Sequence, residues 1–162
     1  FFDYPDGARD CEAVAVDVSN LRVLLLNKRK LPLTLFALPL FPQEGKVVAQ
    51  KIADLMPPPR YERGLEAEYG ESAFFIGLPT GMDLSGSRLL VTTIRNAYLF
   101  DYMNLNAAPI EVNLPFVGQR EGITFSNYDT DVAYVSRERK NGTQVADIFR
   151  IDFVSTTKST MH

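Results

Sequence analysis

The chain has 162 residues, of which 46% are hydrophobic and 23% charged, and its formal net charge is −3 at pH 7. This composition is typical of a globular domain, and the slight negative charge argues against binding to nucleic acid or to an anionic membrane surface. No apolar stretch is long enough to span a membrane, because Pro32 and Pro39 interrupt the longest one.

Short runs rich in β-branched and aromatic residues, separated by Gly, Pro and Asp, predict β-strands along the whole chain. The first is Phe1–Tyr4, and a Pro5-Asp6-Gly7 turn follows it. Residues 47–52 also fit helical spacing, but their β-branched content favours a strand. The polar stretch 57–72 is predicted to be an insertion and 154–162 a tail. The other predicted strands are 13–17, 22–26, 33–38, 73–78, 82–84, 89–94, 98–102, 110–114, 123–125, 132–136 and 148–153.

One strand-turn-strand unit recurs three times, and its copies begin near Glu12, Thr80 and Glu121. The second and third copies are spaced like four-stranded blades of about 40–50 residues, and the insertion accounts for the longer first spacing. An aromatic residue stands in the third strand of each unit, as expected where bulky side chains fill the space between neighbouring sheets. We therefore predict one domain over 1–162, with units at roughly 10–55, 73–116 and 119–153.

This pattern predicts an all-β fold, a β-propeller-like array of about three four-stranded antiparallel blades. Such an array is either a partial propeller or half of a ring that a partner copy completes. A β-sandwich or a plain β-meander is the alternative, because those folds also consist of short strands and turns.

Three segments, Arg9–Val16, Pro79–Ser85 and Glu121–Phe125, resemble the blade-opening segments of bacterial phytase-like (esterase-like phytase) propellers and of the wider six-bladed class. The resemblance covers about residues 1–153. It implies strands arranged around a central channel, in chains about twice as long as this one. It also implies a periplasmic or secreted protein, with a cytoplasmic one as the alternative, and calcium binding or hydrolase activity as in some relatives.

Acidic residues near the predicted channel are the main candidate site. Glu12 and Glu121 begin equivalent innermost strands, with Arg9, Asp10 and Arg120 beside them. Carboxylate oxygens suit calcium, so Glu12 and Glu121 are candidate metal ligands, and the five residues together are a candidate ligand-binding cluster. The alternative is structural, because the neighbouring arginines could form ion pairs with these carboxylates.

The inventory of reactive side chains favours a non-catalytic role. Cys11 is the single cysteine, and the single histidine is His162, the last residue. A disulfide within the chain, a thiolate metal site and a Ser-His-Asp triad are therefore disfavoured, and no catalytic residue is assigned.

Two functions and an assembly hypothesis follow. The first function is a binding or scaffold module that presents an acidic channel mouth to a small-molecule ligand or a protein partner. The alternative is a calcium-dependent, phytase-like phosphoesterase or esterase. Three blades would also leave open sheet faces, which predicts either a homodimer or packing against an upstream half of the same propeller.

Overall fold

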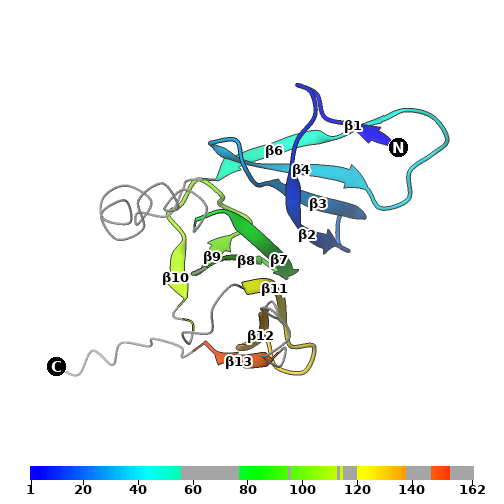
Figure 1. Ribbon diagram of the computed structural model, residues 1–162. Coiled ribbons are helices and arrows are strands. Elements are labelled where there is room, and N and C mark those ends of the chain that lie inside the picture. The colour runs from blue at the N-terminus through cyan, green and yellow to red at the C-terminus, as the bar shows by residue number, and fades with distance from the viewer. Residues whose placement is uncertain (56–76, 95, 113, 115–119, 138–146, 154–162) are drawn as a thin grey trace, which may run out of the picture.

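The structure is a computed structural model that describes residues 1–55, 77–94, 96–112, 114, 120–137 and 147–153. Every regular element in these ranges is a β-strand (Figure 1). The strands form three antiparallel sheets, called blades 1, 2 and 3, and one short parallel pair. The described ranges contain no helix long and apolar enough to cross a membrane.

In each blade, the strands lie side by side in the order in which they occur along the chain. Blade 1 contains β2 (Cys11–Asp17), β3 (Arg22–Asn27), β4 (Leu33–Pro39) and β6 (Gln50–Leu55). Blade 2 contains β7 (Pro79–Ser85), β8 (Arg88–Thr93), β9 (Ala97–Asp101) and β10 (Ile110–Val112). Blade 3 contains β11 (Arg120–Phe125), β12 (Val132–Arg137) and β13 (Ile148–Asp152) in its described part.

The first strands of the blades, β2, β7 and β11, lie innermost, and β7 contacts both of the others. Small residues permit this approach. A Cβ atom added to Gly81 of β7 would lie 3.0 Å from the Cα of Gly122 in β11. On β2, alternate residues are buried, and two of them, Ala13 and Ala15, belong to the apolar cluster that also includes Met82 of β7. The blades therefore stack face against face, as Figure 1 shows.

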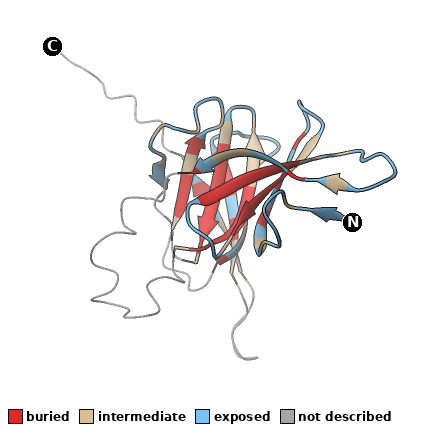
Figure 2. Cartoon of the chain, turned by 90° about the horizontal axis from the view of Figure 1, so that it is seen from above, coloured by how far each residue is buried: buried red, intermediate tan, exposed pale blue. Residues whose placement is uncertain are grey.

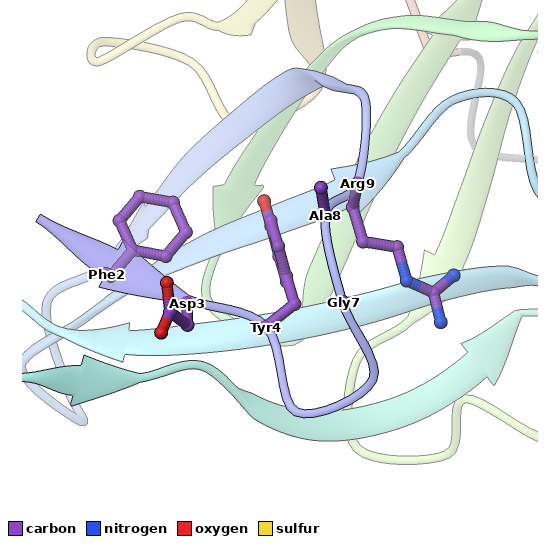
Figure 3. A pocket seen from close by; sticks show the side chains of 6 residues that line it. All are labelled: Phe2, Asp3, Tyr4, Gly7, Ala8 and Arg9. Carbon is purple, nitrogen blue, oxygen red and sulfur yellow. The ribbon is translucent and has the colours of Figure 1, made fainter.

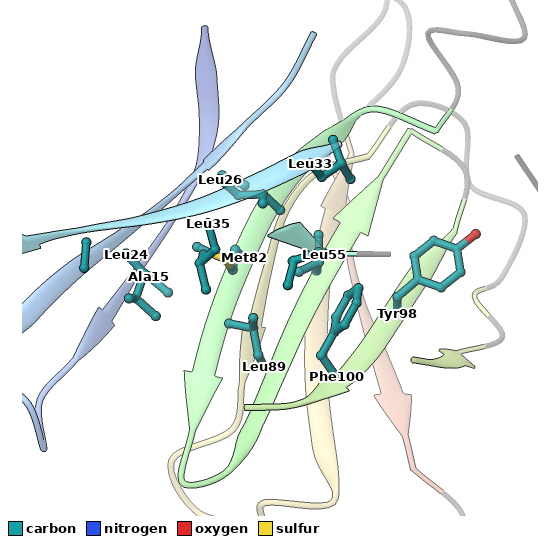
Figure 4. Close-up of a cluster of buried hydrophobic side chains, with 13 residues drawn as sticks. Ala15, Leu24, Leu26, Leu33, Leu35, Leu55, Met82, Leu89, Tyr98 and Phe100 are labelled. Carbon is teal, nitrogen blue, oxygen red and sulfur yellow. The ribbon is translucent and has the colours of Figure 1, made fainter. Parts of the chain in front are cut away.

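Blades 1 and 2 enclose the larger apolar cluster, which we call the first seam (Figure 4). Leucines of β3 and β4 pack there against aromatic and aliphatic side chains of blade 2, because alternate residues of each strand point to the same face. Leu24, Leu26 and Leu35 are fully buried. The buried members are Ala13, Ala15, Leu24, Leu26, Leu33, Leu35, Ala37, Leu55, Met82, Leu89, Val91, Tyr98 and Phe100.

Blades 2 and 3 enclose a smaller cluster, the second seam. The predicted aromatic residues of the third strands occupy matching positions, because Phe36 pairs with Leu25, Tyr98 with Val91 and Phe149 with Val135. Tyr98 lies in the first seam and Phe149 in the second, so both fill the space between blades as predicted. The buried members of the second seam are Leu90, Ala97, Ile123, Phe125, Ala133, Val135 and Ile151.

The strand predicted over residues 47–52 is divided in two. β5 (Val47–Val48) pairs in parallel with β1 (Phe2–Asp3), whereas β6 pairs with β4. The division falls at Ala49, which is buried and donates its backbone N–H to the Asp3 carbonyl at 2.8 Å. Figure 2 shows how burial concentrates in the strands that face a neighbouring blade. Most of the predicted strand 73–78, the insertion 57–72 and the tail 154–162 lie outside the described residues.

Candidate functional site

Each innermost strand carries a β-bulge at the same place. Each inner strand pairs with the second strand of its blade, and the register of that pairing shifts at one residue. This residue, which has no partner on the second strand, is Glu12 in β2, Thr80 in β7 and Glu121 in β11. A bulge adds one residue with no partner across the ladder and redirects its side chain. The predicted equivalence of the three positions is therefore confirmed, and all three stand at the start of an inner strand.

The three bulge residues differ in exposure and in their partners. Thr80, on the middle strand, is only 5% exposed, and its hydroxyl donates to the Thr92 carbonyl at 3.4 Å. Glu12 and Glu121, on the flanking strands, are exposed, and Glu12 forms an ion pair with Lys28. Carboxylate oxygens are hydrogen-bond acceptors, so this end of the inner strands can accept hydrogen bonds from a cationic group.

The acidic and basic neighbours of Glu12 each have a partner of their own. Asp10 pairs with Arg29, while Arg9 pairs with Asp6 and places its guanidinium carbon 5.2 Å from the centre of the Phe36 ring. Arg9 and Asp10 therefore take part in separate local pairs in this structure.

Arg120 is 3% exposed and joins two blades. Its Nη1 atom donates to the carbonyl of Ile94, the residue after β8, at 3.0 Å. In the described ranges, no three His, Cys, Asp or Glu side chains gather closely enough to hold a metal ion. Glu12 and Glu121 remain predicted calcium ligands only, and β7 lies between the strands that carry them.

The sequence did not predict a polar network that lies at the other end of β2 from the bulge, beside the first seam. The Asp17 carboxylate, 2% exposed, accepts hydrogen bonds from Asn20, from Arg22 Nε at 2.9 Å and from the Tyr102 hydroxyl of blade 2 at 2.8 Å. Burial raises the pKa of Asp17, but the hydrogen bonds from Asn20, Tyr102 and Arg22 outweigh it and lower that pKa to about 2. Burial and the bond to Asp17 raise the pKa of Tyr102 to about 12.

The second seam has polar links of its own. Asp83 of β7 accepts hydrogen bonds from the Thr124 hydroxyl and from the Phe125 backbone N–H, both at 2.8 Å. Arg88 pairs with Asp131 of blade 3 at 3.0 Å and lies over the ring of Phe125. Asp83 therefore points away from Met82 and towards blade 3, as strand alternation predicts.

A sequence signal for these links exists. Asp17 and Arg22 are separated by four residues, and so are Asp83 and Arg88. Both arginines open the second strand of their blade, and both reach the next blade, Arg22 by donating to the Tyr102 hydroxyl. The repeated spacing could have identified these residues as candidates for joining blades.

Two hollows lie beside the N-terminal segment and blade 1. One has a volume of about 440 Å³ and is lined by residues between Phe2 and Arg9 (Figure 3). The other, of about 460 Å³, is lined largely by apolar side chains, including Phe1, Val23 and Leu38. The first hollow includes the polar side chains of Asp3, Tyr4 and Arg9, and both hollows are open to solvent.

The arrangement of the sheets resembles that of proteins of known structure. The chain is similar to a luciferin-regenerating enzyme, with a TM-score of 0.56 and 9% identity over 90% of this chain and 46% of that one. It is also similar to the WD40 domain of Pan2 from Neurospora crassa, with a TM-score of 0.53 and 9% identity over 90% of this chain and 35% of that one. The fold is a β-propeller fold. The prediction of a propeller-like array is confirmed, and the sandwich or meander is not supported.

The extent of the match matters for function. This propeller array spans about half the length of the luciferin-regenerating enzyme and about a third of the Pan2 domain. At 9% identity the likeness concerns the fold alone. No protein-family model and no curated protein sequence matches the chain, so the predicted phytase-like family is not confirmed.

Proposed function

We propose that the chain is a non-catalytic binding module of β-propeller type, which binds a cationic ligand or a basic segment of a partner at the bulged end of its inner strands. The observation that carries this proposal is the repeated bulge, which places Glu12 and Glu121 at equivalent, exposed positions on both sides of Thr80. A feature kept in register in three blades at one end of the inner strands supports a common binding surface there.

The charges around the bulges support a cationic ligand. Glu12 and Glu121 are exposed and acidic, and the middle bulge residue, Thr80, is uncharged. Lys28 neutralises Glu12 in the absence of ligand, so a bound cation has to displace the Lys28 ammonium group. The Glu12 side chain is 40% exposed and that of Lys28 13%, so a cation approaches this pair from the Glu12 side.

Calorimetry with two probes tests the proposal. Calcium chloride and spermidine are titrated separately into the wild-type chain, into a Glu12→Gln, Glu121→Gln double variant and into Glu44→Gln as a matched control. Glu44 is an exposed carboxylate in the loop before β5. We expect heat of binding for at least one probe, at least tenfold weaker binding in the double variant and unchanged binding in the control.

A Lys28→Met variant sharpens the test, because it removes the competing ammonium group and should strengthen binding of the same probe. The absence of heat with both probes overturns the proposal. Binding that survives in the double variant does so too, since the ligand would then bind elsewhere.

A further inference from the structure

The two faces of each blade have distinct roles. We call the face towards the preceding blade the front face and the face towards the following blade the rear face. In blade 2 the front face contributes Met82, Leu89, Val91, Tyr98 and Phe100 to the first seam. In blade 3 it contributes Ile123, Phe125, Ala133, Val135 and Ile151 to the second seam. Front faces thus contribute apolar side chains to both seams, where they meet apolar residues of the preceding blade's rear face, such as Leu24 and Leu90.

Blade 1 has an equally apolar front face, although no described blade packs on it. The strand registers identify the positions that match the buried front face of blade 2. Val14 is 47% exposed, whereas the matching Met82 is 4% exposed and Ile123 is 7% exposed. Every matching residue of blade 1 is apolar: Val14, Val16, Val23, Leu25, Phe36 and Leu38.

The N-terminal segment covers only the outer part of this face. Tyr4 packs edge-to-face on Phe36, with ring centres 5.0 Å apart, and the cluster under it includes Leu25 and Ala49. The inner part, at Val14 and Val16, stays 43–47% exposed. The open area continues the pattern of the two existing seams, where Met82 and Ile123, at the position of Val14, are covered by a rear face.

At the other end of the array, no blade among the described residues packs on the rear face of blade 3. The matching positions of blade 3 include Thr124, Tyr134, Ile148 and Arg150, and Ile148 is 74% exposed. Rear faces elsewhere carry small residues on the inner strand, as Ala13 of blade 1 does. Blade 3 keeps that property, because Gly122 stands at the position that matches Ala13.

We infer that a second copy of this chain packs the rear face of its blade 3 on the front face of blade 1, and that the same contact recurs in the opposite direction. The arrangement continues the seams already present. Three blades span about half of the luciferin-regenerating enzyme, so two copies related by a two-fold axis supply the number of blades that a ring needs. The inference depends on the fold and is independent of the proposed cation binding.

Light scattering coupled to gel filtration tests this dimer. The wild-type chain is expected at twice the 18.2 kDa mass of one chain. Val16→Arg on the front face and Ile148→Glu on the rear face should each shift it to one chain mass, or weaken dimerisation at least tenfold. Both side chains are exposed, so neither change should disturb the fold, and circular dichroism melting checks this. Val18→Arg, in the turn after β2 and 70% exposed, is the matched control and should remain dimeric.

A mixture of the two variants distinguishes front-to-rear packing from other arrangements. One copy of Val16→Arg and one of Ile148→Glu retain one undamaged contact, so the mixture should recover part of the dimer that neither variant forms alone. A wild-type monomer up to about 100 μM overturns the inference, because even weak specific interfaces associate in that range. A dimer unaffected by Ile148→Glu also overturns it and indicates that two front faces pair instead.

Discussion

The two seams join similar sheets by different means. The first seam is closed by apolar bulk, with fully buried leucines such as Leu24 and Leu35 facing Leu89. Hydrogen bonds cross both seams, but in the second the inner strands approach each other through glycines, since a Cβ added to Gly81 would lie 3.0 Å from Gly122 Cα. The difference shows that a blade–blade contact can be specified either by side-chain volume or by the absence of side chains, and the two solutions should respond differently to mutation.

The largest expected effect is the loss of volume from the first seam. Leu35→Ala should lower the free energy of unfolding by about 3 kcal/mol, because the side chain is fully buried and leaves a cavity. Ile151→Ala in the smaller second seam should cost about 2 kcal/mol, at the lower end of the range for such changes. Urea denaturation at one protein concentration measures both, with Val18→Ala as the exposed control. Equal losses in the two seams would contradict the comparison.

The next effect comes from adding volume to the second seam. Gly81→Ala should cost about 2 kcal/mol, because the new Cβ would lie 3.0 Å from Gly122 Cα and 3.1 Å from Ile123 N, both backbone atoms. Gly122→Ala is the matched control, since its Cβ would meet the Ser136 hydroxyl oxygen at 3.1 Å, and a side chain can rotate away. The same urea titration should show the smaller loss for Gly122→Ala. If Gly122→Ala is the less stable of the two variants, the close approach of β7 and β11 does not explain the loss of stability.

The smallest of the three effects concerns the buried carboxylate of the first seam. Asp17→Asn should cost about 1–2 kcal/mol at neutral pH, because the folded chain lowers the pKa of Asp17 from 3.8 to about 2. A lowered pKa in the folded state stabilises the protein above the unfolded pKa near 4, and this stabilisation is lost as the pH falls towards 2. Thermal unfolding between pH 6 and pH 2.5 should therefore show the two proteins converge in acid. A difference that does not change with pH would show that charge at Asp17 contributes nothing.

The sequence predicted the repeated strand-turn-strand units of the three blades, because each unit shows the same pattern of apolar and polar residues. The equivalence of Glu12, Thr80 and Glu121 followed from a strand-turn-strand unit that recurs three times, and the pairing registers confirm it. The division of the strand near Val47 could not be predicted, because the backbone N–H of Ala49 bonds to Asp3, far away in sequence.

The polar partners were the least predictable. Arg9 and Asp10 precede Glu12 in the sequence, yet they lie before β2 and pair with Asp6 and Arg29. Asp17 looked like the end of a strand, and nothing local indicates that Tyr102 would approach it from the next blade. Contacts across a seam depend on how the blades stack, and no single strand contains that information.

Cys11, the single thiol of the chain, lies beneath the N-terminal segment, where the Tyr4 hydroxyl donates to its sulfur at 3.0 Å. Burial raises the pKa of this thiol, so little reactive thiolate exists at neutral pH. An alkylating reagent reaches the sulfur fastest in molecules whose Tyr4 has moved aside. The rate at which iodoacetamide alkylates Cys11, followed by mass spectrometry, therefore reports how often the N-terminal segment moves away from blade 1.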